Sequence, residues 1–231
     1  MKIRQYCALA AFMLAYLMAG YLMIVAGWAW TSFDAAMADV RTLPEARLTA
    51  RQAQILTLVE DPRFFGHAGV SLGQGQGFAT ISSAVAREVY LHGADLDGAA
   101  GVLQWLYRRV FACCKKIDLG RDVMAVVLDA KLPKERLLAM YVSQVYMGRM
   151  GRRQLRGLPQ AAESYLGKPL GETSDEEFIH LVAMIKAPNL FHPTRHPAAH
   201  DERFARVRAL LAGTCQPGGW FDTALEQCAP Q

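Results

Sequence analysis

An uncharged run from Tyr6 to Trp30 dominates the hydrophobic pattern at the start of the chain. At about 1.5 Å per residue, a helix over this run is longer than the hydrocarbon core of a bilayer, which is about 30 Å thick. The run also exceeds the roughly 7–15 apolar residues of a signal-peptide core. A cleaved leader is the alternative, because Ala36-Met37-Ala38 resembles a cleavage site. We favour a retained transmembrane helix.

The charges on either side of this run predict its orientation. Lys2 and Arg4 precede it, whereas Asp34 and Asp39 follow it. Positively charged flanks stay on the cytoplasmic side of a membrane. We therefore expect a single-pass protein with a cytoplasmic N-terminus. The expected division is an anchor over 1–31, a globular domain over 32–212 outside the cytoplasm, and a tail over 213–231.

Beyond the anchor, apolar residues recur mainly with the period of a helix. Strand-like alternation is scarce, and the fold class we predict is mainly α. A capping box is expected at Ser174 to Glu177. Loops are expected at 69–77, which is rich in glycine, and at 187–193. Helices are predicted over 45–59, 80–92, 121–132, 133–147, 174–184 and 198–211.

Residues 99–116 form an unusual segment between two of these helices. They place Trp105 and Tyr107 in an apolar body that is flanked by arginines and lysines. This composition is typical of a helix that lies in a membrane interface. A core helix is the alternative that the composition leaves open.

Composition and charge narrow the classes of function. The chain has 231 residues, and without the anchor roughly 200 remain, enough for one globular domain or for one domain with a small lobe. A net charge of +4 gives no indication of a nucleic-acid partner. Cys215 and Cys228 flank a short loop, and an oxidising compartment would allow them to pair. No spacing of cysteine and histidine resembles a zinc site, so no metal site is predicted.

A pair of carboxylates, Glu60 and Asp61, directly follows the apolar run 55–59. Adjacent acids usually cap a helix or face solvent. A carboxylate at the edge of an apolar region, however, tends towards a raised pKa, which suits a general base. Phe64 and His67 follow closely and complete the pattern E-D-x-x-F-x-x-H-x-G.

This pattern resembles the first signature of the peptidoglycan glycosyltransferases, glycosyltransferase family 51. Segments 124–148, 155–168 and 181–197 resemble later motifs of the same family in the right order. The resemblance implies a lysozyme-like, mainly helical fold with a membrane-associated jaw. It also implies polymerisation of lipid II, an undecaprenyl-pyrophosphate disaccharide-pentapeptide, on the periplasmic side of the inner membrane.

The resemblance assigns roles to individual residues. Glu60 becomes the general base that takes the proton of the attacking sugar 4-hydroxyl. The leaving pyrophosphate needs cations or a metal, for which Arg87, Lys186 and Arg195 are candidates. A loop-fixing hydrogen bond is the favoured alternative for His67, and a surface salt bridge is an equal alternative for Arg156. The substrate-binding residues we expect are Asp61, Phe64, His67, Thr80, Arg87, Arg121, Arg156, Lys186 and Arg195.

The chain departs from the family pattern in its second and third motifs. The second usually reads Gly-x-Ser-Thr-x-Thr-Gln-Gln; Thr80 remains, but Ala79, Ser83 and Ala84 have lost a hydroxyl and both amides. In the third, Arg121 stands where the family carries a second Glu, and 93–120 contains an insertion. A guanidinium has no acceptor atoms for a metal. Arg121 is therefore expected to pair either with the leaving pyrophosphate or with Asp122 or Asp118.

Three functions follow from this comparison. The first is an active glycosyltransferase, with a divalent cation as the one candidate cofactor. The second is a catalytically impaired member that binds lipid-linked substrate or cell-wall assembly partners. The third is a lysozyme-like hydrolase, against which the lack of a matched second carboxylate argues. The expected partners are lipid II and nascent glycan, the membrane and cell-wall transpeptidases, since no transpeptidase region follows in this sequence.

Overall fold

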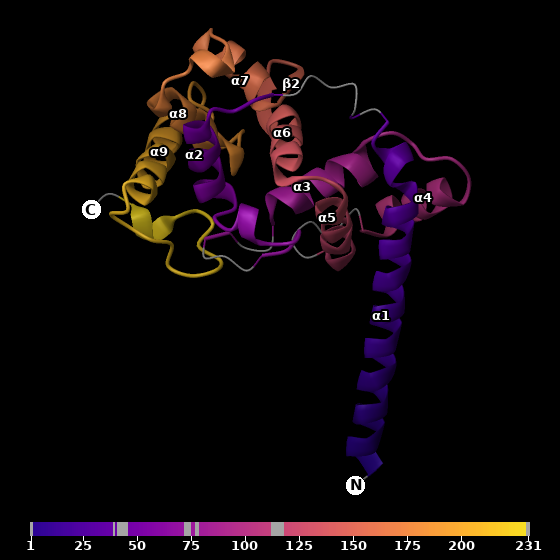
Figure 1. The fold of residues 1–231 in the computed structure, drawn as a ribbon. Helices are drawn as coiled ribbons and strands as arrows, with labels where there is room; N and C mark the ends of the chain where they lie inside the picture. Colours follow the sequence, from indigo (N-terminus) through magenta and orange to yellow (C-terminus); the bar gives the residue numbers. More distant parts are fainter. Residues whose placement is uncertain are drawn as a thin grey trace.

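The computed structural model describes residues 2–38, 40, 46–71, 75–76, 79–111 and 118–229. Helix α1 (Lys2–Ala36) projects from a mainly helical body (Figure 1). It is long and apolar enough to cross a membrane, with a mean hydropathy of 2.1. Its residues 4–24 are exposed or half-buried, and a helical segment of that length reaches about 30 Å. This exposed part therefore matches the thickness of a hydrocarbon core.

The C-terminal part of α1 belongs to the core of the body. Val25, Trp28 and Ala29 are buried there. The Trp28 indole Nε1 donates a hydrogen bond to the Ala100 carbonyl over 3.0 Å, and the Tyr90 hydroxyl donates one to the Ala29 carbonyl over 2.9 Å. α1 continues without a break across residue 31, where the anchor was expected to end. The exposed apolar segment and the body thus share one helix.

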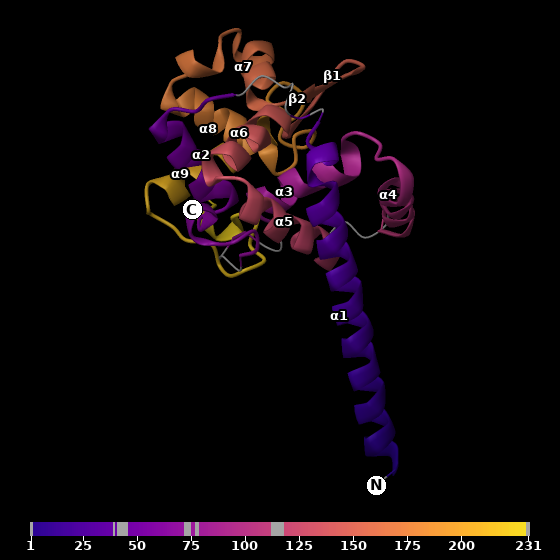
Figure 2. The ribbon, with the colours of Figure 1, turned by 45° about the vertical axis from the view of Figure 1, so that its right-hand side comes forward.

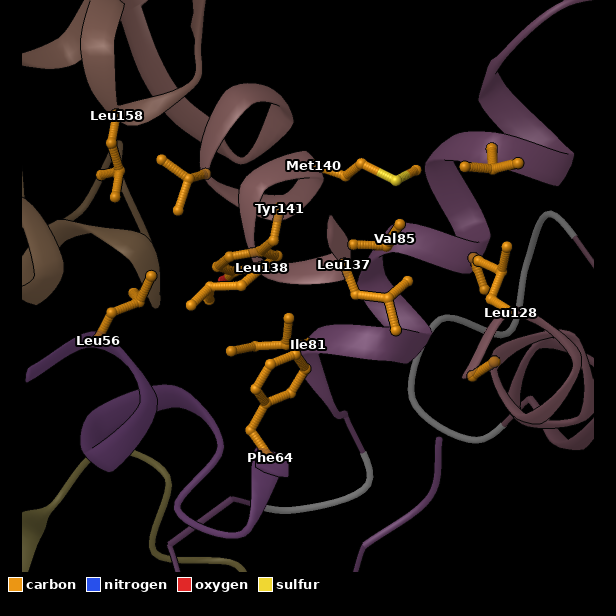
Figure 3. Close-up of a cluster of buried hydrophobic side chains, with 14 of the residues drawn as sticks. Leu56, Phe64, Ile81, Val85, Leu128, Leu137, Leu138, Met140, Tyr141 and Leu158 are labelled. Carbon is orange, nitrogen blue, oxygen red and sulfur yellow. The ribbon is translucent and has the colours of Figure 1, made fainter. Parts of the chain in front are cut away.

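The body is built around α3, which packs against α5 and α6 (Figure 1). On the side away from α1, α8 packs against both α2 and α9. Leu56, Phe64, Ile81 and Leu137 meet in the core between these groups (Figure 3). The bounds are α2 (Ala50–Glu60), α3 (Ile81–Arg87), α5 (Leu119–Lys131), α6 (Lys134–Gln144), α8 (Asp175–Ile185) and α9 (Pro197–Leu211).

Shorter elements connect these helices. The expected helix over 80–92 is α3 followed by a π-helical turn, η3 (Glu88–His92). The described part of the segment 99–116 is helical, as α4 (Gly98–Phe111), and lies beside α1 in Figure 2. The remaining short elements are η2 (Phe64–Gly66), α7 (Leu158–Leu166), η4 (Leu170–Glu172) and η5 (Glu226–Cys228).

Side-chain caps set where several helices begin. The helix predicted from residue 45 instead begins at Ala50, because the Thr49 hydroxyl accepts the Gln52 amide over 3.1 Å. Glu45 lies outside the described residues. The capping box predicted at Ser174 is confirmed, since the Glu177 carboxylate accepts the Ser174 amide over 2.8 Å and the Glu177 amide donates to the Ser174 hydroxyl.

A β-hairpin replaces the end of the helix that was predicted over 133–147. α6 ends at Gln144, and β1 (Tyr146–Met150) then pairs antiparallel with β2 (Arg153–Arg156). The tight turn between the strands contains Gly151 with a φ of +60°, a conformation that favours glycine. The expectation of a helix through residue 147 was therefore wrong, and the hairpin went unpredicted.

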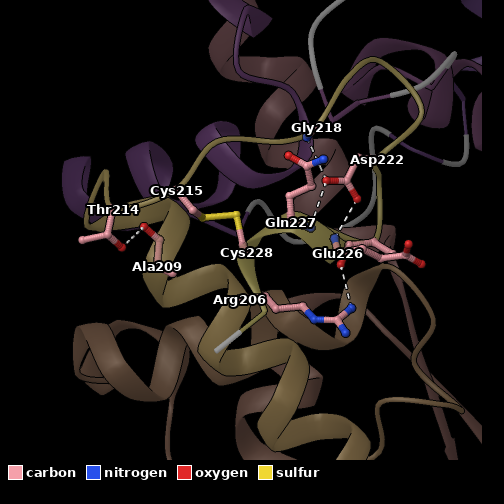
Figure 4. The surroundings of a disulfide bond; sticks show 10 residues. Arg206, Ala209, Thr214, Cys215, Gly218, Asp222, Glu226, Gln227 and Cys228 are labelled. Carbon is pink, nitrogen blue, oxygen red and sulfur yellow. Dashed lines mark hydrogen bonds between the residues drawn. A yellow bond between two sulfur atoms is a disulfide. The ribbon is translucent and has the colours of Figure 1, made fainter. Parts of the chain in front are cut away.

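The C-terminal tail is fastened to α9. Cys215 and Cys228 form a disulfide, the pairing that an oxidising compartment would allow (Figure 4). The Asp222 carboxylate accepts the amides of Gly218 over 2.9 Å and Glu226 over 2.7 Å. Cys113 and Cys114 lie outside the described residues. The disulfide and the Asp222 hydrogen bonds fix the path within the tail. Arg206 Nη1 of α9 donates a hydrogen bond to the Ala224 carbonyl over 3.2 Å and so joins the tail to the body.

Candidate active site

A cleft of ≈ 380 Å³ opens where α2 ends, between α3, α6 and the end of α8. It brings together two carboxylates, two cations and two tyrosines. Gln144 and apolar residues form the remainder of its wall. Its lining residues are Glu60, Ala79, Ala84, Val85, Arg87, Glu88, Tyr141, Gln144, Val145, Tyr146, Ile185, Lys186 and Pro188.

Glu60, the last residue of α2, is half-buried at the inner end of this arrangement. The Tyr141 hydroxyl donates a hydrogen bond to Glu60 Oε2 over 3.3 Å. Burial raises the pKa of Glu60 above its ordinary value, and the charges of Arg203 and Lys186 and the Tyr141 hydrogen bond oppose that rise only in part. A carboxylate with a raised pKa in a cleft has the properties of a general base.

Asp61, in contrast, is fully buried and serves the local fold. Its carboxylate accepts hydrogen bonds from His67 Nε2 over 3.0 Å, from Gln76 Nε2 over 2.9 Å and from the Ile81 amide over 2.9 Å. Ile81 is the first residue of α3. Asp61 therefore ties the loop after Glu60 to the beginning of α3.

His67 and Phe64 lie in the same loop and do not line the cleft. The Gly69 amide donates to His67 Nδ1 over 3.0 Å, so Nε2 carries the hydrogen that reaches Asp61. Phe64 is buried in the core, and the Lys134 ammonium lies 4.7 Å from the centre of its ring. The structure places both side chains as supports of the loop.

Thr80 is likewise a buried support. Its hydroxyl accepts the Ser83 amide over 2.9 Å as the cap of α3 and donates to the Gly69 carbonyl over 2.7 Å. The hydroxyl of Ser83, which replaces an amide side chain of the family pattern, accepts a hydrogen bond from the Thr80 amide over 2.9 Å. Two of the altered second-motif positions therefore lie in different surroundings. Ser83 takes part in the capping box of α3, whereas Ala84 lines the cleft.

Arg87 and Lys186 are the two predicted cations that line the cleft. They approach from different elements, the end of α3 and the residue after α8. Partial desolvation by the cleft wall lowers the pKa of Lys186, while the charge of Glu60 raises it. The cleft therefore combines the candidate base with positive charge from two walls.

Arg121 and Arg195 lie elsewhere. Arg121 is buried at the start of α5 and contacts the Asp122 carboxylate, with its Nη2 at 3.1 Å from Asp122 Oδ1. Its backbone amide donates to the Asp118 carboxylate over 3.0 Å. Arg195 donates a hydrogen bond to the Arg149 carbonyl at the end of β1. Neither side chain is among the lining residues of the cleft.

Four polar lining residues were missed as site residues: Glu88, Tyr141, Gln144 and Tyr146. Tyr141 was assigned only to the core stripe of its helix, and its hydroxyl contacts Glu60. Glu88 follows Arg87 directly, and its carboxylate accepts a hydrogen bond from Arg156 Nη1 over 2.7 Å. Helical spacing from Glu88 to His92, 3.0 Å away, was the one local signal for such a cluster.

Arg203 of α9 is a further charged residue that the sequence did not single out. Its side chain is buried, and its charge acts on Glu60 from behind the cleft. Burial lowers the pKa of the Arg203 guanidinium, and the Glu60 carboxylate opposes this. In the sequence, a buried arginine on an apolar face of this helix cannot be distinguished from an exposed arginine nearby.

The described side chains do not form the ligand set that a divalent cation requires. Within the part of the chain that the structure describes, no three His, Cys, Asp or Glu side chains gather as a metal site would require. At the third-motif position Arg121 supplies a cation in place of a ligand. Arg87 and Lys186, the cations that line the cleft, are therefore the groups available to balance negative charge there.

Comparison with known proteins identifies the family to which the chain belongs. The family described as Transglycosylase matches residues 33–212. The chain belongs to this family, the peptidoglycan glycosyltransferases. The mainly helical, lysozyme-like fold that the motifs implied is thereby confirmed.

Relatives carry this domain within much longer proteins. Over 159 residues, 68% of the chain, it is 31% identical to penicillin-binding protein 1B of Escherichia coli (strain K12), of which it covers 18%. Over 193 residues, 78% of the chain, it is 31% identical to penicillin-binding protein 1A of Streptococcus oralis, of which it covers 28%. The chain thus spans less than a third of the length of these two relatives.

Proposed function

We propose that the chain is a membrane-anchored glycosyltransferase that polymerises lipid II, with Glu60 as the general base. The observation that supports this most is the half-buried Glu60, whose pKa burial raises, in a cleft that Arg87 and Lys186 also line. Glu60 takes the proton of the acceptor sugar's 4-hydroxyl. The resulting oxygen nucleophile attacks the anomeric carbon of the donor, and the bond to the pyrophosphate breaks.

The leaving group distinguishes transfer from hydrolysis of a glycan. A glycan hydrolase needs a carboxylic acid that protonates the departing sugar oxygen. Glu88 is the second carboxylate of the cleft, but it does not suit this role. Burial would raise its pKa, yet contacts with His92 and Arg156 outweigh burial and lower it. A pyrophosphate leaves as an anion and needs cations instead, which Arg87 and Lys186 supply.

The membrane supplies the substrate in this proposal. The exposed part of α1 crosses the bilayer, and the domain lies on the periplasmic side of the inner membrane. α4 presents Val102, Trp105, Leu106 and Val110 as exposed apolar side chains next to this anchor. Such a face suits contact with the acyl region, where the lipid of the substrate remains. Cell-wall transpeptidases are the protein partners we propose.

A polymerisation assay tests the proposal directly. The detergent-solubilised full chain is supplied with lipid II, and glycan products are separated by length. We expect product from the native chain, and a loss of about 10²–10⁴-fold in Glu60→Gln, the range that one general base contributes. Glu163→Gln on the exposed face of α7 is the matched control and should retain activity.

A second function follows from Arg121. Because Arg121 is buried and paired with Asp122, the third motif offers no carboxylate to the cleft. An impaired member would bind lipid-linked substrate without turnover. Absence of glycan product from the native chain, under conditions in which an unaltered family member polymerises, would replace the first proposal with this one.

A further inference from the structure

Three charged or titratable side chains meet at the Glu88 carboxylate. Arg156 Nη1 lies 2.7 Å from Oε2, and His92 Nδ1 lies 3.0 Å from Oε1. Arg87 Nη2 lies 3.9 Å from Oε1. Arg87, at the end of α3, lies next to Glu88 and close to His92 in η3, and the fold brings Arg156 of β2 to them. Glu88 and Arg87 both line the cleft.

Glu88 is held more firmly than its arginine partners. Its side chain is 17% exposed, whereas those of Arg87 and Arg156 are 44% and 46% exposed. Glu88 occupies one edge of the Arg156 guanidinium, and a guanidinium carries five donors in a planar fork. Both arginines therefore retain exposed donors. Two guanidiniums against one carboxylate leave the cluster with a net positive charge.

The backbone at Glu88 is unusual as well. Residues Glu88–His92 form a π-helical turn at the end of α3. Single π-helical turns are rare and occur frequently at functional sites. Arg87, the last residue of α3, and Glu88, the first residue of this turn, both line the cleft.

We propose that Glu88 is a positioning residue that holds Arg87 and Arg156 as a clamp for the diphosphate of the lipid-linked donor. This inference rests on the proposed function and adds the means of charge balance at the leaving group. The third-motif position cannot supply it, since Arg121 is buried against Asp122. Arginine binds phosphate oxygens through two parallel donors, which a carboxylate partner can orient.

A simple surface salt bridge is the competing explanation for Arg156. Exposed pairs of this kind contribute little to stability, so their loss would change neither ligand binding nor turnover. The clamp makes a different prediction, because removal of Glu88 frees both arginines to move. The affinity for a diphosphate would then fall even though the net positive charge of the cluster rises. General electrostatic attraction predicts a higher affinity for the diphosphate when Glu88 is removed, whereas positioning predicts a lower one.

A binding experiment on the full chain in detergent tests the clamp without requiring turnover. Affinities are measured for undecaprenyl diphosphate and for undecaprenol, which lacks the charged group. The native chain should prefer the diphosphate, and Glu88→Gln and Arg156→Ala should each reduce that preference about ten-fold, the loss of one oriented charged contact. Arg153→Ala, on the same strand and exposed, is the control and should retain the preference. Glu88→Asp should restore part of it.

A measurement of turnover is the second test of the clamp. If the native chain polymerises lipid II, activity should persist in a chelator, and kcat/KM should fall about ten-fold or more in Glu88→Gln. Unchanged diphosphate preference in Glu88→Gln and Arg156→Ala, both with native thermal midpoints, would overturn the clamp while the polymerase proposal stood. Loss of turnover in a chelator would also overturn it. A native chain that makes no glycan but shows the Glu88-dependent preference would refute polymerisation and retain the clamp.

Discussion

The Tyr141 hydroxyl donates a hydrogen bond to the Glu60 carboxylate over 3.3 Å, and this contact joins the ends of α6 and α2 at the cleft. Burial favours the neutral form of Glu60, whereas the hydrogen bond favours the charged form. Burial prevails, so the pKa of Glu60 is raised. Burial, with the nearby Glu60, also raises the pKa of Tyr141 well above its ordinary value, which keeps the phenol protonated as a donor.

The contact predicts a shift in the pH profile of polymerisation. Glu60 acts as a base only when ionised, so kcat/KM should rise with pH through the raised pKa of Glu60, above its ordinary 4.5. Tyr141→Phe removes an interaction that lowers this pKa. The ascending limb should therefore move to higher pH. A limb that stays in place would show that Tyr141 does not act on the ionisation of the base.

Glu60 also carries a prediction about stability. A group whose pKa is raised on folding contributes stability below its unfolded pKa and loses it as pH rises through the folded pKa. At neutral pH the ionised Glu60 therefore opposes folding. Glu60→Gln should keep or raise the thermal midpoint at pH 7 while it abolishes most activity. A marked fall in the midpoint would indicate that Glu60 has a structural role.

Apolar periodicity predicted α2, α3, α5, α6, α8 and α9, and the capping box predicted the beginning of α8, whereas α7 was not predicted. The hairpin was not predicted either, because Val145 and Met147 continue the apolar pattern of α6 while the chain already runs as a strand. β1 is defined by its pairing with β2, such as Arg149 opposite Gln154, and by the turn at Gly151. Pairing of this kind depends on tertiary structure, which local propensity does not contain.

The candidate site was likewise predicted from the sequence only in part. The motif fixed Glu60, Arg87 and Lys186 as candidates, and all three line one cleft. Local helical spacing pairs Glu88 only with His92, and the position of Glu88 in the cleft depends on the fold. Its contact with Arg156 joins positions 68 residues apart in sequence.

The continuity of α1 predicts that one helix contains two classes of aromatic residue. Phe33 is 9% exposed in the core and lies beneath the Lys131 ammonium at 4.8 Å, whereas Phe12 is 75% exposed. Phe33→Ala should destabilise the full chain in detergent by about 3 kcal/mol, a typical cost for a buried phenylalanine. Phe12→Ala should leave the thermal midpoint unchanged. Equal effects of the two substitutions would contradict a helix shared between anchor and core.

The charges around α1 predict its topology in cells. Lys2 and Arg4 should retain the N-terminus in the cytoplasm, so a reporter fused after Gln231 should be active only if it functions outside the cytoplasm. The same chain with a reporter that requires the cytoplasm serves as the control and should be silent. Activity of the cytoplasmic reporter would reverse the orientation and exclude a periplasmic site.

Trp105 allows a test of whether α4 touches the membrane. Its ring is 59% exposed between Val102 and Leu106, which are also exposed, and the Arg109 guanidinium lies 5.7 Å from it. An apolar face flanked by cations lies favourably at the boundary between headgroups and acyl chains. The full chain is therefore reconstituted into vesicles whose lipids carry brominated acyl chains, which quench tryptophan fluorescence at short range.

In these vesicles Trp105→Phe should remove a component of the emission that is quenched by bromine. Trp220→Phe, in the disulfide-closed tail, is the matched control and should remove a component that is not quenched. Substituting Ser for Leu106 should reduce the quenching of Trp105, because one fewer apolar side chain holds the helix in the interface. Quenching that is the same in the native chain and in Trp105→Phe would place α4 away from the lipid. The exposed apolar face of α4 would then need a protein partner to cover it.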